Sequence, residues 1–149
     1  MNPACGLFLF PCGSCSCFGS NEITEVGGAY IGRMLSENFS ITSLNLSCNR
    51  LADRGVQGLT RALTTNKSLK RLDLSYNYIG DDGLLSLADA LSQNRKITEL
   101  RIWGNYPGQI SSKALVDLLK ERRIAHLETD FKPYIIDGII YMAKLYYDP

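Results

Sequence analysis

The chain has 149 residues, 45% of them hydrophobic and 21% charged, which predicts a single soluble domain. Its 16 basic and 15 acidic residues give a formal net charge of +1, so it lacks the strongly basic surface that attracts nucleic acid or an anionic membrane. The longest apolar runs, residues 7–10 and 139–142, are far shorter than the roughly 20 residues that span a bilayer.

Residues 1–18 are rich in cysteine, glycine and serine, and we predict no regular structure for them. The segment has no basic start and its apolar run stops at Pro11, so we expect no cleavable signal peptide. Four of the five cysteines crowd here, which indicates thiols in a reducing compartment rather than a disulfide framework. Their spacing includes one C-x-x-C, but the second half of a zinc site is missing and we expect no metal. The four are Cys5, Cys12, Cys15 and Cys17.

A repeat of 28 residues follows, in which the pattern LxxLxLxxN occurs three times. The matching aliphatic and asparagine positions are Ile41, Leu69 and Ile97, then Leu44, Leu72 and Leu100, then Leu46, Leu74 and Ile102, then Asn49, Asn77 and Asn105. The alternation at the end of the pattern predicts a strand, and leucines spaced by three and four residues further along predict a helix. Each unit is therefore predicted to be a strand, a turn and a helix.

The same register extends in both directions. Residues 21–40 match the second half of a unit, so half a repeat precedes the first full one. Downstream, Ile124, Leu127 and Thr129 are predicted to form a fourth, imperfect strand. A single unit buries too little apolar surface to offset its conformational entropy, so stability is expected from stacked units with capped ends. We place the repeat domain at residues 19–130.

This pattern resembles the ribonuclease-inhibitor type of leucine-rich repeat. The resemblance implies an α/β fold, a leucine-rich-repeat solenoid in which parallel strands and helices form a curved stack of about three full repeats plus a half repeat. It also implies a protein that binds other proteins and is not an enzyme.

Residues 131–149 are predicted to close the C-terminal end of the stack. Asp137-Gly138 lies between two β-prone runs, which is a strong hairpin signal. We interpret the hairpin as a cap over the last repeat; the alternative is a detachable docking segment.

Catalytic and cofactor chemistry finds little support. The chain has one histidine, His126, and without a second one neither a histidine-pair metal site nor a conventional proton relay is available. Gly27-Gly28 and Gly104 are interpreted as turn and helix-entry glycines, since no nucleotide-binding motif surrounds them. The carboxylates fall at predicted helix starts or on helix faces, where they favour the helix dipole or simply solvate the surface. They are Asp53, Asp81, Asp82 and Asp117. We expect no cofactor.

The variable strand positions are more informative, because their side chains must point to the inner, concave face. At a strand spacing of about 4.8 Å, Arg71 is expected opposite Glu99, and Asp73 opposite Arg101. These residues either form cross-strand pairs and nothing more, or they bind a partner together with neighbouring aromatic side chains. The predicted protein-binding residues are Arg71, Asp73, Tyr76, Glu99, Arg101 and Trp103.

The favoured function is protein binding through this concave strand face. The alternative is a structural component of a larger assembly, ciliary or nuclear for example, whose open N-terminal repeat edge is covered by a partner. A hairpin folded over Trp103 would make that residue part of the cap instead. Nucleic acid and membrane are disfavoured by the near-neutral charge. We expect an intracellular location, cytoplasmic or nuclear, with the cilium as a further candidate.

Overall fold

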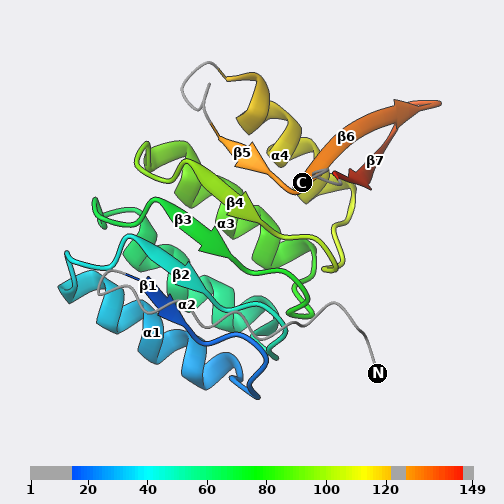
Figure 1. The fold of residues 1–149 in the computed structure, drawn as a ribbon. Coiled ribbons are helices and arrows are strands. Elements are labelled where there is room, and N and C mark those ends of the chain that lie inside the picture. Colours follow the sequence, from blue (N-terminus) through cyan, green and yellow to red (C-terminus); the bar gives the residue numbers. More distant parts are fainter. Residues whose placement is uncertain (1–14, 122–126, 146–149) are drawn as a thin grey trace.

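The computed structural model describes residues 15–121 and 127–145, and the side chains of 18–121 and 127–145. Strands alternate with helices along the chain, and a hairpin follows at the C-terminal end (Figure 1). The elements are β1 (Cys15–Cys17), α1 (Glu25–Glu37), β2 (Ser43–Asn45), α2 (Ala52–Leu63), β3 (Arg71–Asp73), α3 (Asp81–Gln93), β4 (Glu99–Arg101), α4 (Gln109–Lys120), β5 (Glu128–Thr129), β6 (Phe131–Ile136) and β7 (Ile139–Lys144).

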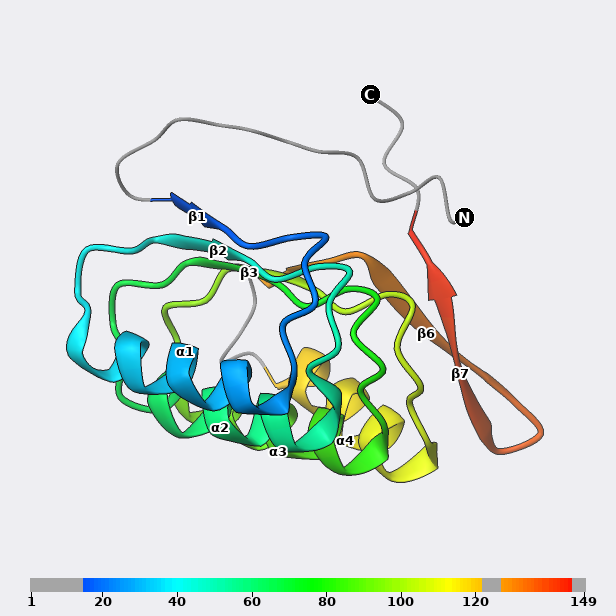
Figure 2. The same cartoon turned by 90° about the horizontal axis from the view of Figure 1, so that it is seen from below.

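The first five strands form one parallel sheet in chain order, and the helices cover one of its faces (Figure 2). The register follows the sequence repeat, because Leu44 pairs with Leu72 and Leu72 pairs with Leu100. Each strand–helix unit therefore lies directly beside the next, which confirms the predicted solenoid.

The fourth predicted strand is shifted by two residues. Sequence comparison set Leu127 against Leu100, whereas the structure pairs Thr129 with Leu100. Thr129 is buried there, and its hydroxyl donates to the Phe131 carbonyl at 2.8 Å. Phe131 is also buried. An aromatic side chain and a bonded threonine thus occupy core positions that leucines hold in earlier units.

The N-terminal boundary of the sheet also differs from the prediction. Strand β1 lies within residues 1–18, which were expected to have no regular structure, and it pairs with β2 so that Ser16 faces Leu44. Main-chain hydrogen bonds continue past β1, where Phe18 N–H donates to Asn45 O at 2.8 Å and Ser20 N–H to Ser47 O at 2.9 Å. These bonds need no aliphatic side chains, so the missing leucine pattern did not reveal the strand.

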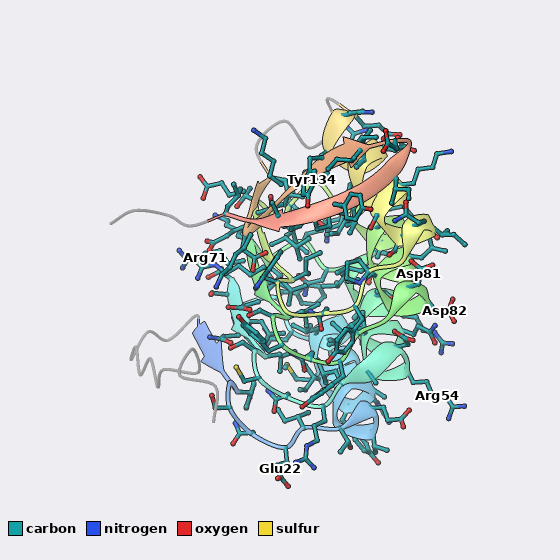
Figure 3. The ribbon with its side chains drawn as sticks, turned by 90° about the vertical axis from the view of Figure 1, so that its right-hand side faces the viewer. Glu22, Arg54, Arg71, Asp81, Asp82 and Tyr134 are labelled. Carbon is teal, nitrogen blue, oxygen red and sulfur yellow. The ribbon has the colours of Figure 1, made fainter. Side chains whose placement is uncertain are left out.

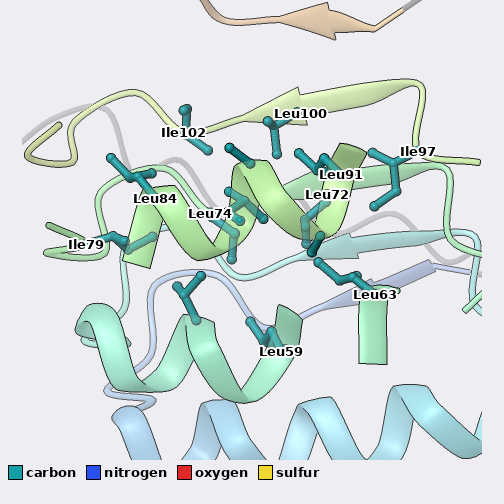
Figure 4. Packing of buried hydrophobic residues seen from close by; sticks show 14 of the residues in the cluster. Leu59, Leu63, Leu72, Leu74, Ile79, Leu84, Leu91, Ile97, Leu100 and Ile102 are labelled. Carbon is teal, nitrogen blue, oxygen red and sulfur yellow. The ribbon is translucent and has the colours of Figure 1, made fainter. Parts of the chain in front are cut away.

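The core lies between the sheet and the helices (Figure 4). The six strand residues that were predicted to be buried are at most 7% exposed: Leu44, Leu46, Leu72, Leu74, Leu100 and Ile102. Helix residues such as Leu59, Leu63, Leu87 and Leu91 complete the cluster. This burial confirms the predicted register.

Buried asparagines link successive units through the turns that leave the strands. Asn77 donates to the Leu46 carbonyl of the previous unit at 2.8 Å and to Leu74 in its own unit at 3.2 Å. Asn105 repeats the arrangement one unit later and accepts the main-chain N–H groups of Asn77 and Ile79, both at 3.0 Å. A side-chain amide can donate and accept at once, so it satisfies main-chain groups that the turn leaves without partners.

Helix N-termini are capped from the neighbouring unit. Asp53 at the start of α2 accepts the N–H groups of Gly80 and Gly83 at the start of α3, at 2.6 and 3.1 Å. Asp81 does the same for Gly108 and Ser111 at the start of α4, at 2.9 and 2.8 Å. A carboxylate suits this place because free N–H groups and the helix dipole both favour negative charge.

Helices α1 and α2 approach unusually closely through glycines. A Cβ atom at Gly28 would lie 2.7 Å from the Gly55 carbonyl oxygen, and one at Gly32 would lie 2.3 Å from that of Gly58. Gly27-Gly28 was predicted to mark a turn or helix entry. The structure places both inside α1, where Gly28 is buried against α2. The glycines therefore set the spacing of the first helix pair.

The C-terminal hairpin consists of β6 and β7 in antiparallel register, with Asp137 and Gly138 at its turn. Both turn residues have positive φ, 50° and 79°, as a type I′ turn requires. The hairpin leaves the end of the stack beside α4 and extends beyond it (Figure 1). Its position next to the last repeat agrees with the predicted cap, although its outer apolar side chains are exposed.

Candidate functional site

The inner face is the side of the sheet that points away from the helices. Arg71 is the register partner of Glu99, and Asp73 is the register partner of Arg101, so the structure brings together the four charged residues that sequence analysis selected. Tyr76 and Trp103 follow the same strands, and Tyr76 N–H donates to the Trp103 carbonyl at 2.9 Å. The six predicted residues therefore lie on β3 and β4 or within three residues of the ends of these strands.

The ionic contacts on this face differ from the predicted pairs. Arg101 binds Glu99 on its own strand, with an N–O distance of 2.8 Å. Asp73 accepts hydrogen bonds from the N–H and the hydroxyl of Ser75, at 3.0 and 2.5 Å. Alternate residues of a strand share a face. Side chains two positions apart in the chain therefore bind each other here, in place of the predicted pairs across the strands. Among the described residues, Arg71 is left without an ion pair.

A half-buried carboxylate, Asp130, lies at the end of the face after β4. Asp130 accepts the N–H groups of Ile102 and Trp103 at 2.9 and 3.0 Å, so it satisfies donors that a further strand would otherwise take. Burial raises the pKa of Asp130; the two N–H groups act against this, and the negative charge of Asp73 adds to it. The acidic group of Asp130 thus binds the main-chain N–H groups just after β4, including that of Trp103.

Exposure separates the six residues into two kinds. Arg71 and Arg101 are exposed, whereas Asp73, Tyr76, Glu99 and Trp103 are partly buried. Trp103 packs against the hydrophobic core, so its ring contributes to stability as well as to the surface. The inner face can offer a partner two guanidinium groups, one of them unpaired, beside an anchored indole.

A second feature lies where the chain leaves the strands and turns toward the helices. It is a groove of about 540 Å³, lined chiefly by Glu22, Arg50, Tyr76, Tyr78, Gly104 and Tyr106; we call it the tyrosine groove. Figure 3 views the molecule from the side where Asp81 and Asp82 begin α3, with Glu22 at one end and Tyr134 of the hairpin at the other.

Sequence analysis selected Tyr76 from this groove but missed Tyr78 and Tyr106. The two rings occupy the same position in adjacent repeats, and their centroids are 6.4 Å apart at an angle of 41°. Both are well exposed, at 60% and 62%. A signal was present, because equal aromatic residues 28 positions apart outside the core pattern indicate a row on the surface.

No metal chemistry emerges from the part of the chain that the structure describes. Within residues 15–121 and 127–145, no three His, Cys, Asp or Glu side chains gather as metal ligands would. His126, Cys5 and Cys12 lie outside the described residues. No described helix is long and apolar enough to cross a membrane.

Cys48 is disulfide-bonded, and the cysteine paired with it is not among the described side chains. This differs from the thiols expected of a reducing compartment. Strand β1, Cys15–Cys17, pairs with β2, the strand that leads to Cys48.

Comparison with known proteins supports the fold. A family model described as Leucine Rich repeat matches residues 37–59 and 65–88. Among solved structures, one titled Leiomodin-1 Actin-Binding Site 2 superposes with a TM-score of 0.70 and 24% sequence identity, over 78% of this chain and 68% of that chain. No curated protein matches the sequence. The fold is a leucine-rich-repeat solenoid.

Proposed function

We propose that this solenoid binds a protein partner through its inner face and performs no catalysis. The single observation that carries the proposal is the surface across β3 and β4, where the exposed Arg71 is unpaired among the described residues and Arg101 lies two residues before the anchored Trp103. Arginine and tryptophan are the commonest anchors of protein interfaces. The rigid sheet beneath them reduces the entropy that binding would cost.

A structural comparison suggests a partner to test, and a sequence resemblance suggests a relative. The solved structure with the same fold is named as an actin-binding site, so actin is a reasonable first partner to test. The segment from Ile102 to Asn105, followed by Asp130, Pro133 and Asp137-Gly138, resembles the C-terminal end of vertebrate leucine-rich repeat-containing protein thirty-four. We propose this relation, the ribonuclease-inhibitor repeat type and an intracellular location together, as expectations that rest on the sequence.

The competing function is that of a structural component whose N-terminal repeat edge is covered in an assembly. Three apolar side chains of that edge support it, because Val26, Tyr30 and Phe39 on or after α1 are 63%, 69% and 71% exposed. Apolar side chains of this size that stay in water mark contact sites when they form one patch. The two functions use different surfaces of the stack and can therefore be separated.

The test compares two double variants in capture with the full chain as bait. Arg101→Ala with Trp103→Ala removes the inner-face anchors, and Arg33→Ala with Tyr30→Ala removes one arginine and one aromatic residue from α1. We expect the first to weaken capture by about thirtyfold or more, which is about 2 kcal/mol, and the second to leave capture unchanged. The reverse outcome would select the assembly function. Thermal melting of both variants checks that lost binding does not reflect unfolding.

A further inference from the structure

We infer that the tyrosine groove binds an extended, proline-rich peptide segment. The inference rests on the proposed function in so far as the chain binds protein, and it names the class of ligand and the place. It is carried by three properties of the groove: the shape of the main chain beneath it, the fixed rings that line it, and the hydrogen-bonding groups that it leaves available.

A residue with a left-handed backbone conformation recurs once per repeat in the groove, and it determines how the rings are arranged. Ser20, Cys48, Tyr76 and Gly104 occupy the same position in successive units and have φ values of 59°, 57°, 54° and 81°. A non-glycine residue in this region costs about 1–2 kcal/mol, and three of the four are not glycine. The same sharp turn therefore recurs in each unit, and it presents the rings that follow it side by side.

The Tyr76 ring occupies space that is free because Gly104, in the next repeat, has no side chain. At Gly104, a Cβ atom would lie 2.3 Å from Cδ1 of Tyr76 and 2.5 Å from its Cε1. The Tyr76 ring therefore rests directly on the main chain of the following unit, in space that any other residue would fill. Tyr78 and Tyr106 complete the row with their tilted contact. The Tyr76 ring, which is held in this way, loses little conformational freedom when a ligand binds.

The main chain beneath the groove has few groups left for a ligand. The N–H groups of Cys48 and Tyr76 bind the carbonyls of Ser75 and Trp103, both at 2.9 Å. Tyr106 N–H binds the Ile79 carbonyl at 2.8 Å. A peptide that joins as an extra strand needs such groups free, so strand addition does not suit this groove.

A polyproline helix fits what remains. Its backbone forms no internal hydrogen bonds and its prolines have no N–H, so it needs ring faces to pack on and donors for its carbonyls. Tyrosine supplies both, through its ring and its hydroxyl. Of the described residues that line the groove, only Glu22 and Arg50 are charged, and they pair with each other at 3.2 Å. The lining is therefore neutral overall and complements an uncharged, proline-rich segment.

The test uses a ten-residue polyproline peptide with blocked ends, titrated into the full chain and followed by calorimetry. A glycine–serine peptide of equal length is the control ligand. We expect saturable binding of polyproline only. Tyr78→Ala and Tyr106→Ala should each weaken it by about tenfold or more, equal to 1.4 kcal/mol. Tyr78→Phe keeps the ring and loses only the hydroxyl donor, so it should weaken binding less than Tyr78→Ala does. Tyr30→Ala, which removes an exposed tyrosine of α1, should change nothing.

Circular dichroism of the variants establishes that each is folded. Absence of saturable polyproline binding to the unmodified chain would overturn the inference, as would equal affinity for the glycine–serine peptide or for the Tyr78→Ala and Tyr106→Ala variants. These results would leave the proposed function standing if the Arg101 and Trp103 variant still lost capture of a protein partner. If the Arg101 and Trp103 variant kept its capture as well, the groove proposal and the inner-face proposal would both be overturned.

Discussion

The side chain of Gln109 binds the main chain of Ile140 at both of its polar groups. Its Nε2 donates to the Ile140 carbonyl and its Oε1 accepts the Ile140 N–H, each at 2.9 Å. In the preceding units the same position holds Asp53 and Asp81, which accept two N–H groups from the next helix. Strand β7 lies where the earlier units have the next helix, and a strand residue offers both a donor and an acceptor, which an amide matches.

Removal of this amide should loosen the hairpin from α4 without unfolding the stack. Each lost hydrogen bond is worth roughly 0.5–1.5 kcal/mol, so Gln109→Ala should speed hydrogen exchange at the Ile140 N–H by about fivefold or more. Gln109→Glu should have a smaller effect, because a carboxylate can still accept the Ile140 N–H and loses only the bond to the Ile140 carbonyl. Gln57→Ala, on an exposed face of α2, is the control. Unchanged exchange at Ile140 in both Gln109 variants would show that the hairpin is held by other contacts.

A charge in the central repeat should unfold the molecule. Leu74 is fully buried in the core beside β3, and Leu74→Asp would leave a carboxylate there without a partner. We expect loss of the cooperative thermal transition measured by circular dichroism. Leu74→Ala should instead remain folded and lose about 2–5 kcal/mol. If Leu74→Asp melted at the temperature of the parent chain, the register would be wrong.

Acidification should weaken the contact between α3 and α4. Hydrogen bonds from the Ser111 hydroxyl and N–H, and from Gly108, lower the pKa of Asp81 below its ordinary value of 3.8, although desolvation acts against them. The folded state therefore binds this proton less well than the unfolded state. The stabilisation is complete above about pH 4 and is lost as pH falls through the lowered pKa.

Denaturant unfolding between pH 2 and pH 5 measures this effect. The stability of the parent chain relative to Asp81→Asn should fall on acidification, because the uncharged variant cannot lose the contribution. Asp82→Asn, at the adjacent exposed position of α3, is the matched variant that removes one carboxylate without removing the bonds to Gly108 and Ser111. A parent-minus-Asp81→Asn difference that stays constant with pH would contradict the assigned role of Asp81.

The two glycines with positive φ offer a matched comparison of backbone strain and ring displacement. Gly104→Ala introduces a side chain both at φ 81° and against the Tyr76 ring. Gly138→Ala meets the same backbone conformation, φ 79°, with nothing within 4 Å. Each pays about 1–2 kcal/mol for the left-handed backbone. Gly104→Ala should lose more in denaturant unfolding, and equal losses would show that the ring moves freely.

Most of the solenoid could be predicted from the sequence, because leucines at a fixed spacing form its core. The strand positions such as Leu72 and Leu100 determine the register, and the asparagines such as Asn77 mark the turns. Strand β1 could not be predicted, since main-chain hydrogen bonds hold it and a side-chain pattern does not mark it. The pairing of Thr129 with Leu100 was not predicted for a similar reason, because a threonine and Phe131 replace the expected leucines.

The shared face of the charged strand residues was predictable from the sequence, but their contacts were not. Alternation along β3 and β4 placed Arg71, Glu99 and Arg101 on one face correctly. Which carboxylate each arginine binds depends on side-chain reach and on competing donors such as Ser75, and neither is visible in a repeat pattern. The role of Asp130 also depends on a loop whose geometry follows from the shifted last strand.

The central claim, that the inner face is the partner-binding surface, is tested most directly by hydrogen exchange of the chain with and without its captured partner. The account predicts slower exchange in peptides that cover residues 71–76 and 99–103 when the partner is bound, and unchanged exchange over residues 26–39. Protection confined to residues 26–39, with residues 71–76 and 99–103 unaffected, would contradict it and place the partner on the N-terminal edge.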